Sequence, residues 1–266
     1  MKTCRTCALI MFAGVIAGGC STFSGPTSGT SSPPTGLHYA KEIPEMKTAV
    51  DEALRRYYSR PDYDSATPLP DQAQLDVQPP ITCYVFSTED YLAGQGLKAA
   101  KFYQYIYYIK SSNKIVGEIG LAWIGGNNVI AFRGQAYAIG AHELATMAPY
   151  YNGLAKAETL AQVKKGSFEL RLLILPADRV APMGRPVETS VMWLKSDATD
   201  GDLIYTYPQG EFVDVPSGLQ PSTVYTVAEV LKAIRPAVQK LQDNPPTRPG
   251  IPELQNIPPT PPGIPR

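Results

Sequence analysis

The stretch FYQYIYYIKSSNKIVGEIGLAWIGGNNVIAFRGQ, residues 102–135, decides the fold of this chain. It contains three runs rich in Tyr, Ile, Val and Phe, separated by the short segments SSN and GGN. Aromatic and β-branched residues favour strands, whereas Ser, Asn and Gly favour tight turns. The pattern therefore predicts a three-stranded antiparallel meander in which short hairpin turns join the strands.

Further elements are expected on both sides of this meander. Apolar residues at helical spacing predict helices over residues 44–58, 141–148, 154–165 and 226–241. Compact apolar runs predict strands over residues 81–86, 168–175, 189–194 and 203–207, and five prolines make residues 60–80 a loop. Strands in runs with helices grouped at the ends indicate an α+β fold, an antiparallel sheet with helices packed at one face.

Two segments have compositions that do not build a core. Residues 20–36 are mostly Ser, Thr, Gly and Pro, which predicts a flexible, disordered tether. Residues 244–266 are a Pro-rich tail with an internal repeat, PPTRPGIP at 245–252 and PPTPPGIP at 258–265. Proline fixes φ and lacks a donor, so we expect this tail to be disordered and partly polyproline II. The α+β domain is then expected to span residues 37–243.

The N-terminus has the layout of a secretory signal peptide, residues 1–19. Lys2 and Arg5 give a short positive region, and residues 8–19 follow without a charge. This apolar run is shorter than the roughly 20 residues that a membrane-spanning helix needs, but it fits the core of a signal peptide.

Residues 16–20, IAGGC, resemble the lipobox of bacterial lipoproteins, with Ala17 where that family most often has leucine. The resemblance covers only the first 20 residues. It implies that the Cys20 thiol receives a diacylglycerol, that the chain is cut before Cys20, and that acyl chains such as palmitate anchor it to a membrane. Ser21 implies the outer membrane of a Gram-negative bacterium, facing the periplasm, with the cell surface as the alternative. An ordinary secretory signal with a chance cysteine is the other interpretation.

Composition excludes several classes of protein. Lys and Arg together number 24, as do Asp and Glu, and no basic cluster is present, so no nucleic-acid partner is expected. Three of the four cysteines lie within the first twenty residues, which leaves no disulfide framework for the body. Cys4 and Cys7 form a C-x-x-C without a second pair at zinc spacing. We therefore expect neither a metal nor another cofactor.

Three motifs resemble parts of catalytic sites. Cys83 and His142 would make a Cys/His hydrolase pair, but Cys83 lies inside the strand-like run ITCYVF and is better interpreted as a buried, inert thiol. His142 and Glu143 open a zincin-like helix whose second histidine is missing, because Thr146 stands there. Ser111 and Lys114 match S-x-x-K, yet they lie between strands, where a tight turn is expected.

Two further motifs resemble binding loops. Gly94, Gly96 and Ala99 follow the spacing of a dinucleotide fingerprint, but too far from the preceding strand, so a loop is favoured. Asp197, Asp200 and Asp202 could supply calcium ligands, whereas an Asx-rich turn between two strands is the simpler interpretation. We therefore assign no catalytic, cofactor-binding or metal-binding residue, and Cys20 stays the single assigned site.

Two features could bind a partner. Tyr103, Tyr105 and Tyr107 would share one face of a strand, where they could stack on sugar rings or a protein surface, or pack beneath a helix. The tail, residues 245–266, could dock as polyproline II into an aromatic groove of an envelope protein, or act as a spacer.

We expect a non-catalytic binding or assembly component of the envelope. The alternatives are a cell-wall or periplasmic hydrolase that uses acidic residues, and a small-ligand carrier.

Overall fold

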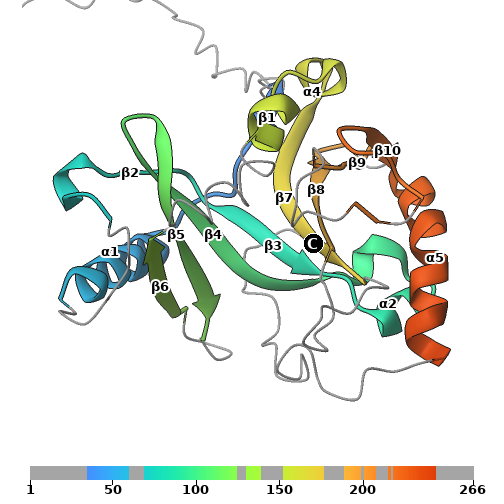
Figure 1. Ribbon diagram of the computed structural model, residues 1–266, viewed down its shortest axis with the longest axis horizontal. Coiled ribbons are helices and arrows are strands. Elements are labelled where there is room, and N and C mark those ends of the chain that lie inside the picture. Colours follow the sequence, from blue (N-terminus) through green and yellow to red (C-terminus); the bar gives the residue numbers. More distant parts are fainter. Residues whose placement is uncertain are drawn as a thin grey trace, which may run out of the picture. The chain divides into compact units, whose positions relative to one another are not determined.

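A computed structural model describes residues 35–59, 69–124, 130–138, 152–176, 189–198, 201–207, 215–216 and 218–243 (Figure 1). These residues belong to one unit, Pro34–Arg266. The expected signal peptide, most of the tether, the helix at 141–148 and the tail lie outside the described residues. So do Cys20, His142, Glu143 and Asp200.

The described elements form an α+β fold built on one large mixed sheet, which confirms the expected fold class. The neighbouring strands run β10-β9-β8-β7-β3-β4-β5-β6, with β1 paired to β7 and β2 to β4. Two 3₁₀ turns, Gln72–Gln74 and Gly96–Ala99, accompany them. The strands are β1 (Gly36–His38), β2 (Asp76–Val77), β3 (Ile81–Val85), β4 (Lys101–Ser111), β5 (Lys114–Trp123), β6 (Phe132–Ala138), β7 (Ser167–Leu175), β8 (Thr189–Ser196), β9 (Leu203–Tyr205) and β10 (Val224–Thr226). The helices are α1 (Pro44–Tyr58), α2 (Thr88–Leu92), α4 (Ala161–Lys165) and α5 (Val227–Asp243).

The meander predicted from residues 102–135 is present as β4, β5 and β6, which pair antiparallel in sequence order. Ser112 and Asn113 form the turn between β4 and β5 with φ of 49° and 61°. Two consecutive positive φ values are typical of the type I′ turn, whose twist suits a two-residue hairpin. The SSN segment therefore acts as the expected turn.

Strand β7 is the centre of the other half of the sheet. It pairs antiparallel with β8 on one side. On its other side it pairs in parallel, first with β1 through Ser167 to Glu169, and then with β3 through Arg171 to Ile174. β1 and β3 thus follow one another along the same edge of β7, and segments far apart in the chain meet there.

Apolar side chains pack on both faces of the sheet. Helix α1 lies over β5 and β6, and α5 lies near β9 and α2, as Figure 1 shows. Both helices contribute side chains to one hydrophobic cluster, which also includes buried residues of the strands from β3 to β9. A second cluster on the opposite face includes Ala157 and Val163 from the 152–165 region. Residues 154–165, predicted as one helix, form two short pieces, because Leu160 is extended (ψ 137°) between residues 152–157 and α4.

The close fit of α1 on the sheet depends on a glycine. Helix α1 begins at Pro44, which suits a first helical position, and buries Met46, Val50 and Leu54. At its closest approach to β6, a Cβ added to Gly134 would lie 2.9 Å from the carbonyl oxygen of Ala49. A side chain at position 134 would therefore push the helix away from the sheet.

Candidate functional site

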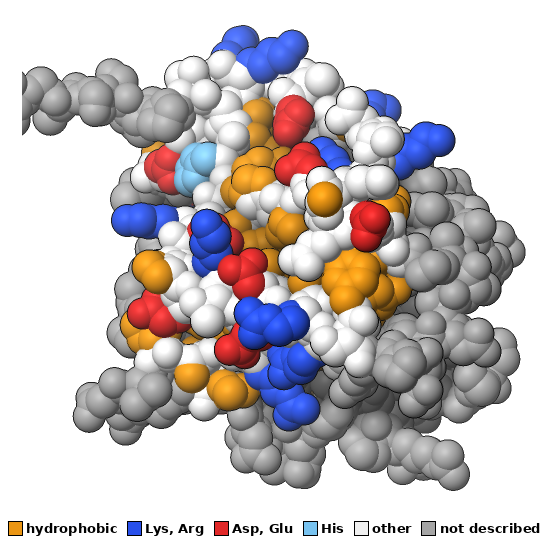
Figure 2. Space-filling view, turned by 90° about the vertical axis from the view of Figure 1, so that its left-hand side faces the viewer, with side chains coloured by type: hydrophobic (Ala, Val, Ile, Leu, Met, Phe, Trp, Pro, Cys, Tyr) orange, Lys and Arg blue, Asp and Glu red, His pale blue; other side chains and the backbone are white. Residues whose placement is uncertain are grey.

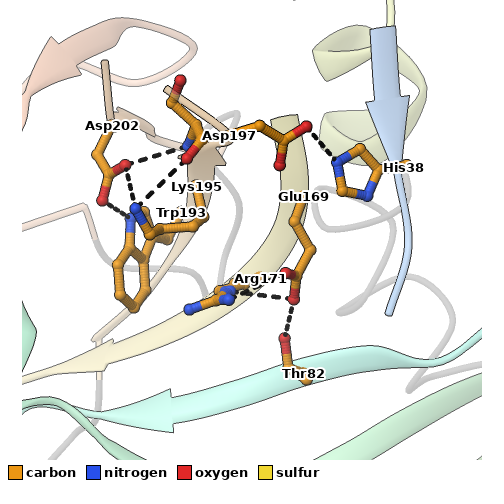
Figure 3. Close-up of polar contacts among 9 residues, drawn as sticks. His38, Thr82, Glu169, Arg171, Trp193, Lys195, Asp197 and Asp202 are labelled. Atoms are coloured by element: carbon orange, nitrogen blue, oxygen red, sulfur yellow. Dashed lines mark hydrogen bonds and ion pairs between the residues drawn. The ribbon is translucent and has the colours of Figure 1, made fainter. Parts of the chain in front are cut away.

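A group of interacting polar side chains lies on one face of β3, β7 and β8 (Figure 3). Side chains at alternate positions of a strand share a face. Glu169 and Arg171 do so on β7, where Glu169 is opposite Lys195 of β8, and Arg171 is opposite Trp193. On the other side of β7, Arg171 is opposite Thr82 of β3. The register of three strands therefore brings these side chains together.

Arg171 and Glu169 form a bidentate ion pair. Nε of Arg171 donates to Oε1 of Glu169 at 3.0 Å, and Nη2 donates to Oε2 at 2.9 Å. The Thr82 hydroxyl donates to the same Oε1 at 3.2 Å. The side chain of Arg171 is 2% exposed and that of Glu169 is 14% exposed. Buried charges are costly unless they are paired and hydrogen-bonded, so this pair needs both of its members.

Two aromatic rings hold the guanidinium of Arg171. Its Cζ lies 4.9 Å from the centroid of Tyr84 and 5.1 Å from that of Trp193. The two rings also contact each other edge to face, with centroids 5.5 Å apart. A desolvated cation–π contact contributes about 2 kcal/mol. Burial raises the pKa of Tyr84, and its hydroxyl has no hydrogen-bond partner among the described residues. The ring of Tyr84, more than its hydroxyl, therefore serves this cluster.

Asp202 fixes the hairpin between β8 and β9. Its carboxylate accepts from Nε1 of Trp193 at 3.0 Å, from Nζ of Lys195 at 3.0 Å and from the backbone N–H of Ser196 at 3.1 Å. The bond from Ser196 spans six residues, whereas an Asx turn binds the backbone two residues further on. Asp202 therefore connects the end of β8 to the residues before β9.

Asp197, at the same hairpin, binds different partners. Its Oδ2 accepts from the Ser167 hydroxyl and lies 3.2 Å from Nε2 of His38. The hydrogen bond from Ser167, more than the contact with His38, lowers the pKa of Asp197. In a serine hydrolase the imidazole lies between the hydroxyl and the carboxylate. Here the carboxylate lies in the middle, so the three residues do not form a nucleophile with its base.

The cluster is built to hold strands together. Glu169, Asp197 and Asp202 each accept hydrogen bonds from side chains that lie on other strands or across a turn. Asp197 and Asp202 face different partners, and an ammonium group already occupies Asp202. Over the described ranges, no three His, Cys, Asp or Glu side chains lie close enough to hold a metal ion. We call this cluster, which spans β1, β3, β7 and β8, the polar clasp. It consists of His38, Thr82, Ser167, Glu169, Arg171, Trp193, Lys195, Asp197 and Asp202.

The tyrosine face expected on β4 needs correction. Tyr105 and Tyr107 are 4% and 1% exposed and belong to the core beneath α1, whereas Tyr103 is 39% exposed. A face made of all three rings is therefore not available to a partner. The alternative expectation, in which these tyrosines pack beneath a helix, is correct for Tyr105 and Tyr107.

The remaining motifs follow their structural interpretations where they are described. Cys83 is buried within β3 at 2% exposure. Gly94 and Gly96 have positive φ and lie in the turns that follow helix α2. Ser111 and Lys114 face each other across the β4–β5 turn. The second members of the Cys83–His142 pair and of the His142–Glu143 motif lie outside the described residues.

The sequence contains a signal for part of the polar clasp. In SFELRLLIL, residues 167–175, a glutamate and an arginine stand two positions apart in an otherwise apolar strand. Such spacing places them on one face, where opposite charges pair. The aromatic partners, Tyr84 and Trp193, come from distant strands, so local sequence could not indicate them.

Lys, Arg, Asp and Glu side chains are interspersed over the described surface seen in Figure 2, with hydrophobic side chains near its centre. No helix within the described ranges is long and apolar enough to cross a membrane. Comparisons of the chain with protein-family models, with curated proteins and with solved structures gave no match.

Proposed function

We propose that this protein is a lipid-anchored, non-catalytic binding or assembly component of the Gram-negative cell envelope. The observation that carries the anchor is the sequence IAGGC at residues 16–20 and its likeness to a lipobox. Several acyl chains on one cysteine give stable membrane attachment, whereas a single chain gives marginal binding.

The polar clasp supports a non-catalytic role. A general acid or base must reach substrate with a group that can exchange a proton. In the clasp, Glu169 and Asp202 each bind a cationic side chain and further donors, and these contacts join β3 to β7 and β8 to the segment before β9. We therefore assign the clasp a stabilising role. Recognition of a partner is assigned to the surface of the domain and to its tail.

The anchor is tested by labelling cells with a palmitate analogue and separating membranes from soluble protein. Cys20→Ala should lose the label and release the protein into the soluble fraction. Cys7→Ala is the matched control, because it removes a cysteine of the same signal segment that lies outside the lipobox, and it should label normally. Continued labelling of Cys20→Ala would contradict the anchor.

A single substitution tests the proposed outer-membrane location. The lipoprotein resemblance implies that Asp after the lipidated cysteine retains a protein at the inner membrane, whereas Ser21 permits transfer. We expect Ser21→Asp to shift the labelled protein from outer-membrane to inner-membrane fractions of a density gradient. An unchanged distribution would contradict sorting by this residue.

Docking by the tail is tested by crosslinking in cells. The full chain is compared with a chain that stops at Asp243, and the captured proteins are identified by mass spectrometry. Discrete partners that are lost on truncation support docking through residues 245–266. Partners retained by both chains would place the contact on the folded domain.

A further inference from the structure

The meander β4–β5–β6 has one face that helix α1 covers and one face that carries polar and aromatic side chains. Ile119, Leu121 and Ala136 point to the α1 side, where they are buried in the core. Because side chains alternate along a strand, the residues between them point to the opposite side. On β6 these are Arg133, Gln135 and Tyr137, and all three are exposed.

A bulge in β4 adds a second aromatic ring to that side. Cys83 is opposite Gln104 while Tyr84 is opposite Phe102, so Tyr103 is the extra residue. Phe102 and Tyr105 both lie in the α1-side core although three positions separate them. The bulge therefore turns Tyr103 and Gln104 together toward the other side. We call the resulting surface the open face, formed by Tyr103, Gln104, Glu118, Gly120, Ala122, Arg133, Gln135 and Tyr137; Glu118 of β5 is opposite Tyr137 of β6.

The register places these groups in a continuous strip. Gly120 of β5 is opposite Gln135 of β6, and Ala122 is opposite Arg133. Gly120 has no side chain of its own, and the amide of Gln104 lies over it, because a Cβ added there would lie 3.1 Å from Oε1 of Gln104. With about 3.3 Å per residue and 4.8 Å between strands, Tyr103 and Tyr137 lie roughly 18 Å apart. The strip is long enough for an extended oligomer.

The open face carries one cation, Arg133, and one anion, Glu118, so its formal charges cancel. Its other polar groups suit a neutral polymer with many hydroxyl and amide groups. Two primary amides, Gln104 and Gln135, both donate and accept hydrogen bonds, and Arg133 donates in a planar fork. Tyr103 and Tyr137, each 39% exposed, present apolar ring faces with a polar tip. The buried centre of a protein–protein interface is usually apolar. Here the exposed rings are separated by small and polar residues, an arrangement suited to sugar rings that stack while their substituents form hydrogen bonds.

We propose that the open face binds a glycan strand of the cell wall, a chain of N-acetylated sugars. The inference names the partner class of the proposed envelope component and rests on that proposal for the protein's location. The rings of Tyr103 and Tyr137 stack on sugars near the two ends of the bound segment. Arg133 and the two glutamines bind the hydroxyl and acetamido oxygens between them.

The test is co-sedimentation of the purified full chain, held in detergent, with protease-treated peptidoglycan sacculi, and titration with a soluble N-acetylglucosamine hexamer. Tyr137→Ala and the double variant Arg133→Ala with Gln135→Ala should each weaken hexamer binding about tenfold. Tyr58→Ala is the matched control, because Tyr58 is also a 39% exposed tyrosine but lies on α1, remote from the open face. It should bind normally. Thermal unfolding of each variant verifies that it folds.

Three outcomes overturn the inference. The first is no binding of the wild-type chain to either probe. The second is binding that the open-face variants leave unchanged, which places the glycan site elsewhere. The third is a photo-crosslinker at position 137 that captures a protein, which makes the open face a protein interface. Acyl labelling of Cys20 in the same preparations separates these failures from failure of the proposed anchor.

Discussion

Arg171 donates two hydrogen bonds to Glu169, its neighbour two positions earlier on β7, and both bonds are 3.0 Å or shorter. A bidentate guanidinium–carboxylate pair has a fixed planar geometry, and here Tyr84 and Trp193 also fix the position of the cation. The pair therefore sets how β3, β7 and β8 lie against one another, in the middle of the sheet.

Removing one member of this pair should destabilise the domain strongly. Arg171→Met leaves the Glu169 carboxylate without its cation, and we expect a loss of about 3–5 kcal/mol in the free energy of unfolding. Urea denaturation measures this loss. The double variant Arg171→Met with Glu169→Leu removes both charges and should recover most of it. A double variant as unstable as the single one would show that the charges are not the cause.

Arg56 should protect the free edge of the sheet. Strand β6 ends the strand order, and Nη2 of Arg56 donates to the carbonyl oxygen of Gly134 at 2.7 Å. The N–H of Ile124 binds the carbonyl of Ala131, so by the alternation of an antiparallel ladder the carbonyl of Gly134 points away from β5. Arg56 thus occupies a group that a foreign strand would need.

We expect Arg56→Ala to self-associate at concentrations where the wild type is monodisperse, as measured by light scattering. It should also lose about 1–2 kcal/mol of stability, because a hydrogen bond to a charged group is lost. Arg55→Ala is the control, since Arg55 is an exposed arginine on the same helix. If the two variants self-associate and unfold alike, Arg56 does not protect the edge strand β6.

Gly134→Ala should separate α1 from β6. The new Cβ would lie 2.6 Å from Cδ2 of Leu121 and 2.9 Å from the carbonyl oxygen of Ala49. Overpacking of this kind costs about 1–3 kcal/mol, and chemical denaturation should show it. In Gly120→Ala the nearest atom is the terminal Oε1 of Gln104, at 3.1 Å, which can move away. A similar loss in both variants would mean that the helix contact is not responsible.

Asp197 should stabilise the fold above acidic pH. Its pKa is lowered in the folded protein, first by the hydrogen bond from Ser167. A carboxylate with a lowered folded-state pKa contributes stability above its unfolded pKa, near the ordinary value of 3.8, and loses it as the pH falls through the folded value. The advantage of wild type over Asp197→Asn in urea midpoint should therefore shrink as the pH falls below about 4. A constant difference down to pH 2 would contradict this role.

The sequence predicted local structure well where periodicity and turn chemistry agree. Residues 44–58 form α1 with the expected bounds, and the SSN turn joins β4 to β5. It did not predict the parallel pairing of β7 with β1 and β3, because those partners lie far apart in the chain and no local pattern encodes their register. The helix expected over residues 154–165 divides at Leu160. The alternation that placed three tyrosines on one face failed at the β4 bulge, where Tyr103 is inserted.

The candidate sites also differ in how far the sequence alone predicts them. Glu169 and Arg171 could have been found from their spacing, whereas Tyr84 and Trp193 reach the same cluster only through strand register. Arg133, Gln135 and Tyr137 acquire a shared exposed face from the pairing of β6 with β5. The Cys20 prediction depends on the signal segment alone and is independent of the fold.

The parallel pairing of β1 with β7 has a mechanical consequence. The backbone N–H of Gly36 binds the carbonyl of Gly166 at 2.7 Å, and residues Gly36–His38 pair with Ser167 to Glu169. A pull along the axis of β1 would stretch these hydrogen bonds together instead of opening them one after another. Because these bonds share the load, β1 would resist such a pull. A force on the chain before β1 would thus be carried into β7, a central strand of the sheet.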